Sequence, residues 1–512
     1  MKRILPILLC LALLLGLLGA CGAKEVVPYT PTGDGLEGAS TPTEPENQSG
    51  DNTGIVMCYN PDATMNPYTC ADLTNRALMS FLYQGLFAVD RDYSVIPVLC
   101  SRYKISADMK THTFFLGDAR FSDGTALTAA DVAASLEAAK KGDYYRGRFQ
   151  HLGSVEAQGG TVVITTDIPM ENLPILLDIP IVKTGEVAVE RPLGTGPYQL
   201  ESSGEELLLR RQTAWWCTMP LTIDASTIPL RGTGVPSEIR DNFEFSDVNL
   251  VLTDPGSDTY ADYRCDYEIW DCENGLFLYL VCNSESAVFS NDSVRRCLTH
   301  AIDRDRLSDE CYHGFARGAT LPASPLSPVY TMSLAEKYDY APDKMREALS
   351  TAGQTGATVT LLLNSDDTLR LRAGRAIAQM LTDCGLTVKI VELNTKEFRS
   401  RAAGKDYDLY LGQTKLSANM DLSAFFKQGG SLSYGGLADP AIYAMSQEAL
   451  TNSGNFYNLH KMVMDDAQLC PLLFRSYGIY TRRGMLPDLY PSRDRVLNYS
   501  GGQTLEDITE KG

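Results

Sequence analysis

Residues 359–390 contain the pattern that most restricts the fold of this chain. Residues 359–363 are an apolar run that suits a buried strand, and 386–390 alternate between apolar and other residues, as a second strand does. Between them, apolar residues recur at helical spacing over 369–380. A strand, a helix and a strand with short connections form a βαβ unit with parallel strands. The sequence therefore predicts an α/β fold.

The first residues have the layout of a secretory signal. Lys2 and Arg3 precede an apolar run over 4–18, which is shorter than the about 20 residues needed to span a bilayer. Two small residues and Cys21 follow at once. We expect residues 1–20 to be removed as a signal peptide. Leu18-Gly19-Ala20-Cys21 resembles the lipobox of bacterial lipoproteins, which implies a diacylglycerol anchor on Cys21. The alternative is an ordinary cleaved signal with an incidental cysteine.

Residues 21–54 are predicted to form a flexible tether. They are rich in Pro, Gly, Ser, Thr and Glu and have almost nothing to bury, and such a coil extends over roughly 30 Å. The remaining stretch of about 460 residues is too long for one core of ordinary size. We therefore expect two or more lobes after the tether.

Composition limits the class of partner. The chain is 44% hydrophobic and 21% charged, which is typical of a globular protein, and its net charge is −19. A nucleic-acid partner would require a basic patch, and none is visible in the sequence. The acidic surface could steer cationic ligands, but a solvated surface is the simpler interpretation. We expect no nucleic-acid partner.

Thirteen cysteines are many for an exported chain. With Cys10 in the signal and Cys21 in the lipid position, eleven remain, and an odd number cannot all pair within one chain. No C-x-x-C occurs and the five His are scattered, so no metal site is expected. Most cysteines, such as Cys297 and Cys470, stand in apolar patterns. We interpret them as mostly reduced core residues.

Catalytic motifs are not visible in the sequence. The chain has no G-x-S-x-G elbow, P-loop, H-E-x-x-H or Ser-x-x-Lys set. Spacing alone does not pair its many carboxylates into an acid/base dyad. The pattern favours binding over catalysis, and no cofactor is expected.

Several short motifs occur in a fixed order along the body. They are Asn66-Pro67, Tyr83-Gln84-Gly85-Leu86 with Asp90, Phe121-Ser122-Asp123-Gly124, Gly194-Thr195-Gly196-Pro197-Tyr198 and Val294-Arg295-Arg296-Cys297-Leu298. The most specific extends over 121–132, where Thr128 and Asp131 have the spacing of a capping box that starts a helix. In these motifs the chain resembles the family 5 extracellular solute-binding proteins, the peptide/nickel type that serves ATP-driven importers.

The resemblance implies a two-lobed fold like that of periplasmic binding proteins, of type II, with an extra subdomain in the first lobe. The first lobe is expected over 55–275, with the subdomain at about 65–190. The second lobe is expected over 276–465, and 466–512 would return to the first lobe. The motifs at 121–132 and 194–198 are expected to shape turns rather than touch ligand.

The resemblance also implies a function. The chain would be a monomeric, non-enzymatic receptor on the extracellular face of the cell membrane, and the lipid expected on Cys21 agrees with this. It would bind an oligopeptide or similar small solute between its lobes and deliver it to the permease subunits of an ABC transporter. A metal-chelate, a sugar or an opine-like compound is an alternative cargo. A surface hydrolase is an alternative of another class.

Candidate ligand-binding residues follow from the same resemblance. In peptide-binding members an Asp soon after a second-lobe strand pairs with the ligand's amino group, and Asp421 is the only Asp in that place here. It could equally cap a helix that starts at Leu422. Lys415 would receive a carboxylate or, as we slightly favour, remain solvated. Asn419 belongs to the same stretch and is a further candidate.

Other candidates lie on the predicted helix and on aromatic positions. Arg370 and Arg372 could hold a ligand carboxylate as a bidentate fork, but residues two apart diverge on a helix, so at least one must face solvent. Tyr83 and Trp270 are candidate cleft aromatics, as is Tyr198. Core packing is the competing role for each aromatic.

Overall fold

The computed structural model describes residues 54–204, 206–256, 263–499 and 501–511, all within one compact unit, Gln48–Gly512. The predicted signal peptide, Cys21 and the tether up to residue 53 lie outside the described residues. Within the described part, no helix combines the length and the apolar composition needed to cross a membrane.

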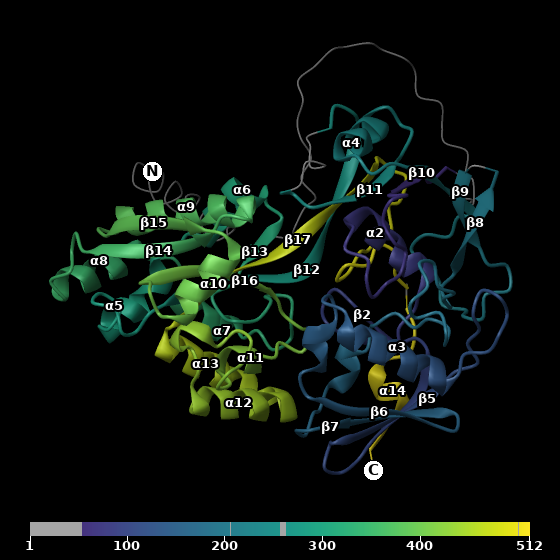
Figure 1. Cartoon of the computed structure of the whole chain (residues 1–512), viewed down its shortest axis with the longest axis horizontal. Helices are drawn as coiled ribbons and strands as arrows, with labels where there is room; N and C mark the ends of the chain where they lie inside the picture. Colours follow the sequence, from purple (N-terminus) through teal and green to yellow (C-terminus); the bar gives the residue numbers. More distant parts are fainter. Residues whose placement is uncertain (1–53, 205, 257–262, 500, 512) are drawn as a thin grey trace, which may run out of the picture. The chain divides into compact units, whose positions relative to one another are not determined.

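A mixed sheet runs through the described body (Figure 1). Its strands are β1 (Met57–Tyr59), β8 (Tyr198–Ser203), β9 (Glu206–Arg211), β10 (Thr227–Gly232), β11 (Leu250–Thr253), β12 (Tyr267–Cys282), β13 (Ala316–Gly318), β14 (Thr358–Asn364), β15 (Thr387–Leu393), β16 (Leu409–Lys415) and β17 (Leu469–Arg482). Their order is β15-β14-β16-β12-β17-β11-β1-β10-β9-β8, and β13 pairs with β17. The two long strands β12 and β17 are neighbours and form the middle of this order.

The predicted βαβ unit is confirmed. Strands β14 and β15 pair in parallel along their whole lengths, and helix α9 (Thr368–Asp383) connects them. The side chain of Asp367 accepts a hydrogen bond from the backbone N–H of Arg370 and so caps the helix. Strand β16 lies parallel to β14 on its other side. The carboxyl ends of these parallel strands therefore face the same edge of the sheet.

Helices cover the sheet around β14, β15 and β16 (Figure 1). They are α5 (Asp292–Cys297), α6 (Arg304–Tyr312), α7 (Met332–Ala335), α8 (Pro342–Thr351), α10 (Thr395–Ala403), α11 (Ser423–Phe426), α12 (Pro440–Thr451) and α13 (Phe456–Asp466), with short 3-10 turns at Leu298–Ala301, Glu336–Tyr338, Tyr434–Gly436 and Ser453–Asn455. Helices α5, α6 and α8, together with α9 and β12, contribute to one of the two largest hydrophobic clusters.

A second, five-stranded sheet, a two-stranded sheet and the remaining helices complete the described structure. The elements are α2 (Leu73–Leu82), β2 (Phe87–Val89), β3 (Val95–Pro97), β4 (Cys100–Ile105), β5 (Thr111–Leu116), α3 (Ala129–Lys141), β6 (Leu152–Gln158), β7 (Thr161–Thr166), α4 (Pro236–Glu244), α14 (Leu505–Ile508) and β18 (Thr509–Lys511), with 3-10 turns at Arg146–Phe149 and Leu173–Leu176. The order is β18-β4-β5-β7-β6, so the end of the chain returns to this sheet. The capping box of Thr128 and Asp131 at α3 is confirmed.

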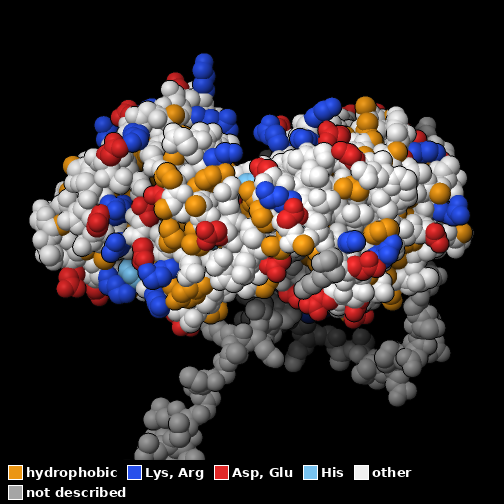
Figure 2. Space-filling model, turned by 90° about the horizontal axis from the view of Figure 1, so that it is seen from below, with side chains coloured by type: hydrophobic (Ala, Val, Ile, Leu, Met, Phe, Trp, Pro, Cys, Tyr) orange, Lys and Arg blue, Asp and Glu red, His pale blue; other side chains and the backbone are white. Residues whose placement is uncertain are grey.

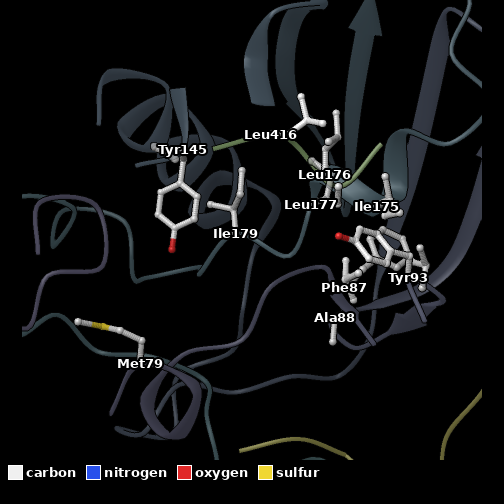
Figure 3. Packing of buried hydrophobic residues seen from close by; sticks show 14 of the residues in the cluster. Met79, Phe87, Ala88, Tyr93, Tyr145, Ile175, Leu176, Leu177, Ile179 and Leu416 are labelled. Atoms are coloured by element: carbon white, nitrogen blue, oxygen red, sulfur yellow. The ribbon is translucent and has the colours of Figure 1, made fainter. Parts of the chain in front are cut away.

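The largest hydrophobic cluster joins distant segments of the chain. Figure 3 shows Leu176 and Leu177 beside Phe87 and Tyr93 of the β2–β3 region, and Leu416 close to Leu176. Leu416 directly follows β16, so the cluster includes a residue from beyond the βαβ region. Apolar burial thus reaches from the first half of the chain to the strand ends described below.

The Gly194–Tyr198 motif has a packing role. A Cβ at Gly194 would lie 2.1 Å from the backbone oxygen of Leu82, and a Cβ at Gly196 would lie 2.5 Å from the backbone oxygen of Phe81. Both positions therefore exclude any side chain, because the end of α2 occupies that space. This packing supports a structural role for the motif, although the sequence predicted a turn and not close packing against α2.

The eleven cysteines within the described residues are free thiols, and eight are buried. Burial raises the pKa of several of them, for example that of Cys272 to about 12. The thiolate is the reactive form, so burial keeps these groups unreactive.

Candidate functional site

A cavity of about 880 Å³ lies where β14 and β16 end. Its volume falls within the about 300 to 1,000 Å³ of small-molecule sites. One wall comes from residues 143–150 and Arg493; the other comes from the strand ends and the helices around them. The lining residues are Asp143, Tyr144, Arg146, Gly147, Arg148, Gln150, Asn364, Arg370, Thr395, Phe398, Arg399, Ala403, Gly412, Gln413, Thr414, Lys415, Leu416, Ser417, Asp421, Ala424, Phe425, Ser431, Leu432, Tyr434 and Arg493.

The wall formed by α9 and α10 carries two arginines, and we call it the helical wall. The Nε of Arg370 donates to Asp367 at 2.7 Å, which leaves its two terminal nitrogens without a partner in the described part of the chain. Arg399 of α10 is exposed, and no hydrogen bond or ion pair from a described residue reaches it. Burial raises the pKa of the Tyr434 hydroxyl, and the charges of Arg399 and Arg370 oppose this rise. Both guanidinium groups therefore act on one side of the cavity.

The Lys415 side chain extends from the end of β16 to the opposite side of the cavity, where it forms an ion pair with Asp494. The Lys415 Nζ contacts Asp494 Oδ2 and donates to the Tyr144 hydroxyl at 2.7 Å, and that hydroxyl donates to Asp494. The guanidinium of Arg76 lies 3.3 Å from the centre of the Tyr144 ring. We call these four residues, with Arg493, the locked wall.

The pKa values of the locked wall follow from burial and mutual charge. Burial lowers the pKa of Lys415 to about 8, although Asp494 opposes this effect. Burial alone would raise the pKa of Asp494, but the charge and hydrogen bond of Lys415, together with Arg76, outweigh it, so this pKa lies below its usual value. The carboxylate is therefore ionised at neutral pH.

Arg493 connects the locked wall to the middle of the sheet. It is buried and donates to the Tyr93 hydroxyl at 3.0 Å, and Tyr93 donates to Glu273 of β12. Ser324 donates to the other oxygen of Glu273 at 2.7 Å. Burial raises the pKa of Glu273 despite these bonds. The positive φ angles of Arg493 (28°) and Asp494 (69°) show that the backbone adopts an unfavourable conformation to place these side chains.

His151 bridges the two sides of the cavity. Its Nδ1 lies 3.1 Å from Asp167 Oδ1, and its Nε2 lies 3.3 Å from Asp421 Oδ2 and from the Ser423 hydroxyl. Burial would lower the pKa of the imidazole, but the hydrogen bonds and charges of Asp421 and Asp167 outweigh burial and raise it. Asp421 Oδ1 also accepts from the backbone N–H of Ser423 at 2.8 Å. Both oxygens of Asp421 are therefore occupied within the protein.

Three of the predicted ligand-binding residues line the cavity: Arg370, Lys415 and Asp421. The expectation that Lys415 is solvated is wrong, because its side chain is only 22% exposed and is paired with Asp494. Its buried partner comes from a segment 79 residues away, which no local pattern indicates. Arg372 points elsewhere and donates to the backbone oxygen of Cys311 at 3.4 Å.

The other three predicted residues do not line this cavity. Asn419 borders a separate cavity of about 50 Å³ and accepts from the Ser417 hydroxyl at 2.8 Å. Tyr83 is buried, and its hydroxyl donates to the backbone oxygens of Met65 and Pro192. Trp270 is a strand residue of β12 that packs against the largest hydrophobic cluster.

Several lining or bridging residues escaped prediction from the sequence: Tyr144, His151, Arg399, Arg493 and Asp494. Arg399 differs in no way from other exposed helical arginines in the sequence. Tyr144 meets Asp494 because the chain end returns to its first half, and His151 meets Asp421 and Ser423 from the second half of the chain. Sequence patterns carry no signal for such long-range contacts.

A cavity at the carboxyl ends of parallel strands, bordered by a segment from the first half of the chain, is the arrangement of a small-molecule binding site. The sequence profile of the bacterial extracellular solute-binding proteins, family 5, middle region, matches residues 94–433, more than half of the chain. The chain belongs to this family, as its motifs predict. The family consists of substrate-binding receptors of ABC importers and not of enzymes, so the hydrolase alternative is wrong.

Individual relatives agree with this assignment. The glutathione-binding protein GsiB of Salmonella typhi is 26% identical over 378 residues, which cover 69% of this chain and 71% of GsiB. The ABC transporter substrate-binding protein CtaP of Listeria monocytogenes has a similar structure, with a TM-score of 0.70, 17% identity and coverage of 88% and 100%. NikA of Brucella suis, solved in complex with Fe(III)-EDTA, has a TM-score of 0.66, 18% identity and coverage of 87% and 100%. The two-lobed α/β fold is therefore confirmed.

Proposed function

We propose that this chain is a lipid-anchored receptor that binds a short peptide or similar carboxylate-bearing solute in the cavity of about 880 Å³ and delivers it to an importer permease. The observation that carries the proposal is the helical wall, where Arg399 and the terminal nitrogens of Arg370 have no protein partner among the described residues. Guanidinium groups bind carboxylates through paired N–H donors. A ligand carboxylate would fill this role.

The lipid anchor rests on the signal sequence. The small residues before Cys21 resemble a lipoprotein processing site, and the following tether would hold the receptor near its permease. The test is fractionation of cells that express a Cys21→Ala variant, with Cys10→Ala as the control within the signal. We expect Cys21→Ala to leave the membrane fraction and Cys10→Ala to remain there. Unchanged membrane association of Cys21→Ala would overturn the anchor.

The lobe boundary near residue 275 stays a prediction with structural support. The pairing of β12 and β17 shifts register between Glu273 and Phe277, and Gly275 has a φ of +72°. A ligand that contacts both sides of the cavity would favour the closed arrangement, because only that arrangement supplies all the contacts. The irregularity in β12 provides a place where the sheet can bend.

The class of solute is tested by ligand binding to the purified mature receptor. Native mass spectrometry would reveal solute retained through purification, and thermal shift would then compare glutathione, longer peptides and metal-chelates. The name of GsiB and the NikA complex make glutathione and a chelate suitable members of this panel. Binding of a peptide in preference to chelates and sugars supports the proposal. Binding of a sugar alone, with no carboxylate-bearing compound, would contradict it.

A further inference from the structure

The cavity and the whole chain have opposite charge. The chain carries a net charge of −19. The cavity is lined by six cationic side chains and two carboxylates, Asp143 and Asp421. The cations are Arg146, Arg148, Arg370, Arg399, Lys415 and Arg493. Figure 2 shows an indentation on one face of the molecule, with Lys and Arg side chains on both sides of it.

Counter-ions inside the protein neutralise only part of this excess. Arg148, Arg370 and Lys415 each contact a carboxylate that does not line the cavity: Asp178, Asp367 and Asp494, respectively. Arg146 pairs with Asp143 at 3.2 Å on the exposed rim. Two cations remain without a carboxylate at contact distance.

These two cations are Arg399 and Arg493, one from each side of the cavity. Arg399 has no partner in the described residues, and the bond of Arg493 at 3.0 Å goes to the Tyr93 hydroxyl, which is uncharged. A buried guanidinium is stabilised by an anion that accepts its N–H groups. Each side of the cavity thus offers a place for one anionic group of a ligand.

A ligand ammonium group has no comparable place. Asp421 already accepts bonds from His151 and from the backbone of Ser423. Asp143 is 92% exposed and paired, so its attraction for a ligand is screened by water. An ammonium group entering the cavity would meet cations without gaining a carboxylate of its own.

We infer that the cavity selects a solute with at least two carboxylates or equivalent anionic groups, and that a free amino group on the solute adds little to affinity. One anionic group would lie between Arg399 and the terminal nitrogens of Arg370, and the other near Arg493. The inference rests on the proposed function and narrows its ligand class. An acidic peptide and a non-peptide polycarboxylate share this chemistry.

Isothermal titration calorimetry of the mature receptor tests the inference with four probes. The peptide Ala-Glu-Glu is compared with neutral Ala-Gln-Gln, with N-acetylated Ala-Glu-Glu, and with tricarballylate, which has three carboxylates and no amine. We expect Ala-Glu-Glu to bind about 10-fold or more tightly than Ala-Gln-Gln, because charge-assisted bonds are the stronger ones. Acetylation should change the affinity less than about 3-fold. Tricarballylate binding at least as tightly as Ala-Glu-Glu would identify a non-peptide source.

Arg399→Gln provides the matched variant. It should weaken binding of the tightest of the three acidic probes by about 10-fold or more, and that of Ala-Gln-Gln by less, because its single carboxylate can bind near Arg493 instead. Arg375→Gln is the control, because Arg375 lies on α9, pairs with Glu392 of β15 and does not line the cavity. If Ala-Gln-Gln binds as tightly as Ala-Glu-Glu, the inference fails and the proposed function stands. If no probe and no solute of the wider panel binds, both fail.

Discussion

The two sides of the cavity use similar charges in different ways. On the locked wall, Lys415, Asp494 and Tyr144 bond to one another, and only Arg493, whose bond goes to the uncharged Tyr93 hydroxyl, keeps its charge available to a ligand. On the helical wall, Arg399 and the terminal nitrogens of Arg370 have no partner within the described residues. Charges whose partners lie inside the protein support the fold. Charges whose partners are missing are available to a ligand.

The difference separates stability from recognition. Removing one member of a mostly buried ion pair leaves an uncompensated charge, which is costly. Removing an exposed, unpaired arginine leaves nothing uncompensated. The group of Lys415, Asp494 and Tyr144 in the locked wall should therefore respond to mutation mainly in the free energy of unfolding, and the helical wall mainly in ligand affinity.

The largest effect is expected for Asp494→Asn. The substitution keeps the shape of the side chain, and Asn tolerates the positive φ of this residue, but Lys415 loses its counter-ion. We expect the free energy of unfolding to fall by about 3 kcal/mol. Urea denaturation at neutral pH measures it. Asp143→Asn, at the exposed pair with Arg146, is the control and should change stability by less than about 0.5 kcal/mol. If both variants lowered the free energy of unfolding by the same amount, the buried pair would be no more important for stability than the exposed pair.

Gly196→Ala extends the comparison to the scaffold motif. The new Cβ would lie 2.5 Å from the backbone oxygen of Phe81 and 2.6 Å from that of Leu82, and neither atom can move without shifting α2. We expect a loss of about 2 kcal/mol in the free energy of unfolding. Gly160→Ala, where no atom lies within 4 Å of the new Cβ, is the control. A Gly196→Ala protein with unchanged stability would show that the motif has another role.

The bridge made by His151 should depend on pH. Because Asp421 and Asp167 raise its pKa, the protonated imidazole stabilises the folded state fully below about pH 6.5, and this contribution is lost as pH rises through the folded pKa. We expect His151→Gln to cost about 1.5 kcal/mol at pH 6 and less at pH 9. Thermal unfolding of both proteins across this range measures the difference. If the stability difference between the two proteins increased with pH, the protonated imidazole would not be the stabilising form.

The smallest effect on stability is expected for Arg399→Gln. Since Arg399 is exposed and has no partner among the described residues, the free energy of unfolding should change by less than about 0.5 kcal/mol in the absence of ligand. Urea denaturation of the variant without added solute is the measurement. A larger loss would show that the helical wall is also part of the folding core.

The sequence predicted the fold well where the signals are local. The βαβ unit over 359–390 depends on apolar periodicity, and the capping box at Thr128 depends on a spacing of three residues. Both predictions are confirmed because each depends only on residues that are close together in the sequence. The family assignment rests on motifs of the same local kind, such as 194–198.

The candidate site was only partly predictable. Lys415 and Asp421 were identified because their stretch corresponds to the ligand-binding segment of peptide-binding family members, but their roles depend on Asp494 and His151, which are distant in sequence. Tyr83 was chosen as an aromatic, yet its hydroxyl is bonded to buried backbone oxygens. Whether a polar side chain can bind a ligand depends on whether other side chains of the folded protein already provide its hydrogen-bond partners. Only the folded chain decides that.

The turn at Arg493 and Asp494 has a consequence for the evolution of this receptor. Two successive non-glycine residues with positive φ are unfavourable, and a change to Asn-Gly would relax the backbone. That change would also remove the partner of Lys415 and the donor to Tyr93. A substitution that relieves backbone strain at this turn would therefore remove side-chain contacts that stabilise distant parts of the chain. Descendants that lose Asp494 should also lose Lys415, so the two positions are expected to change together.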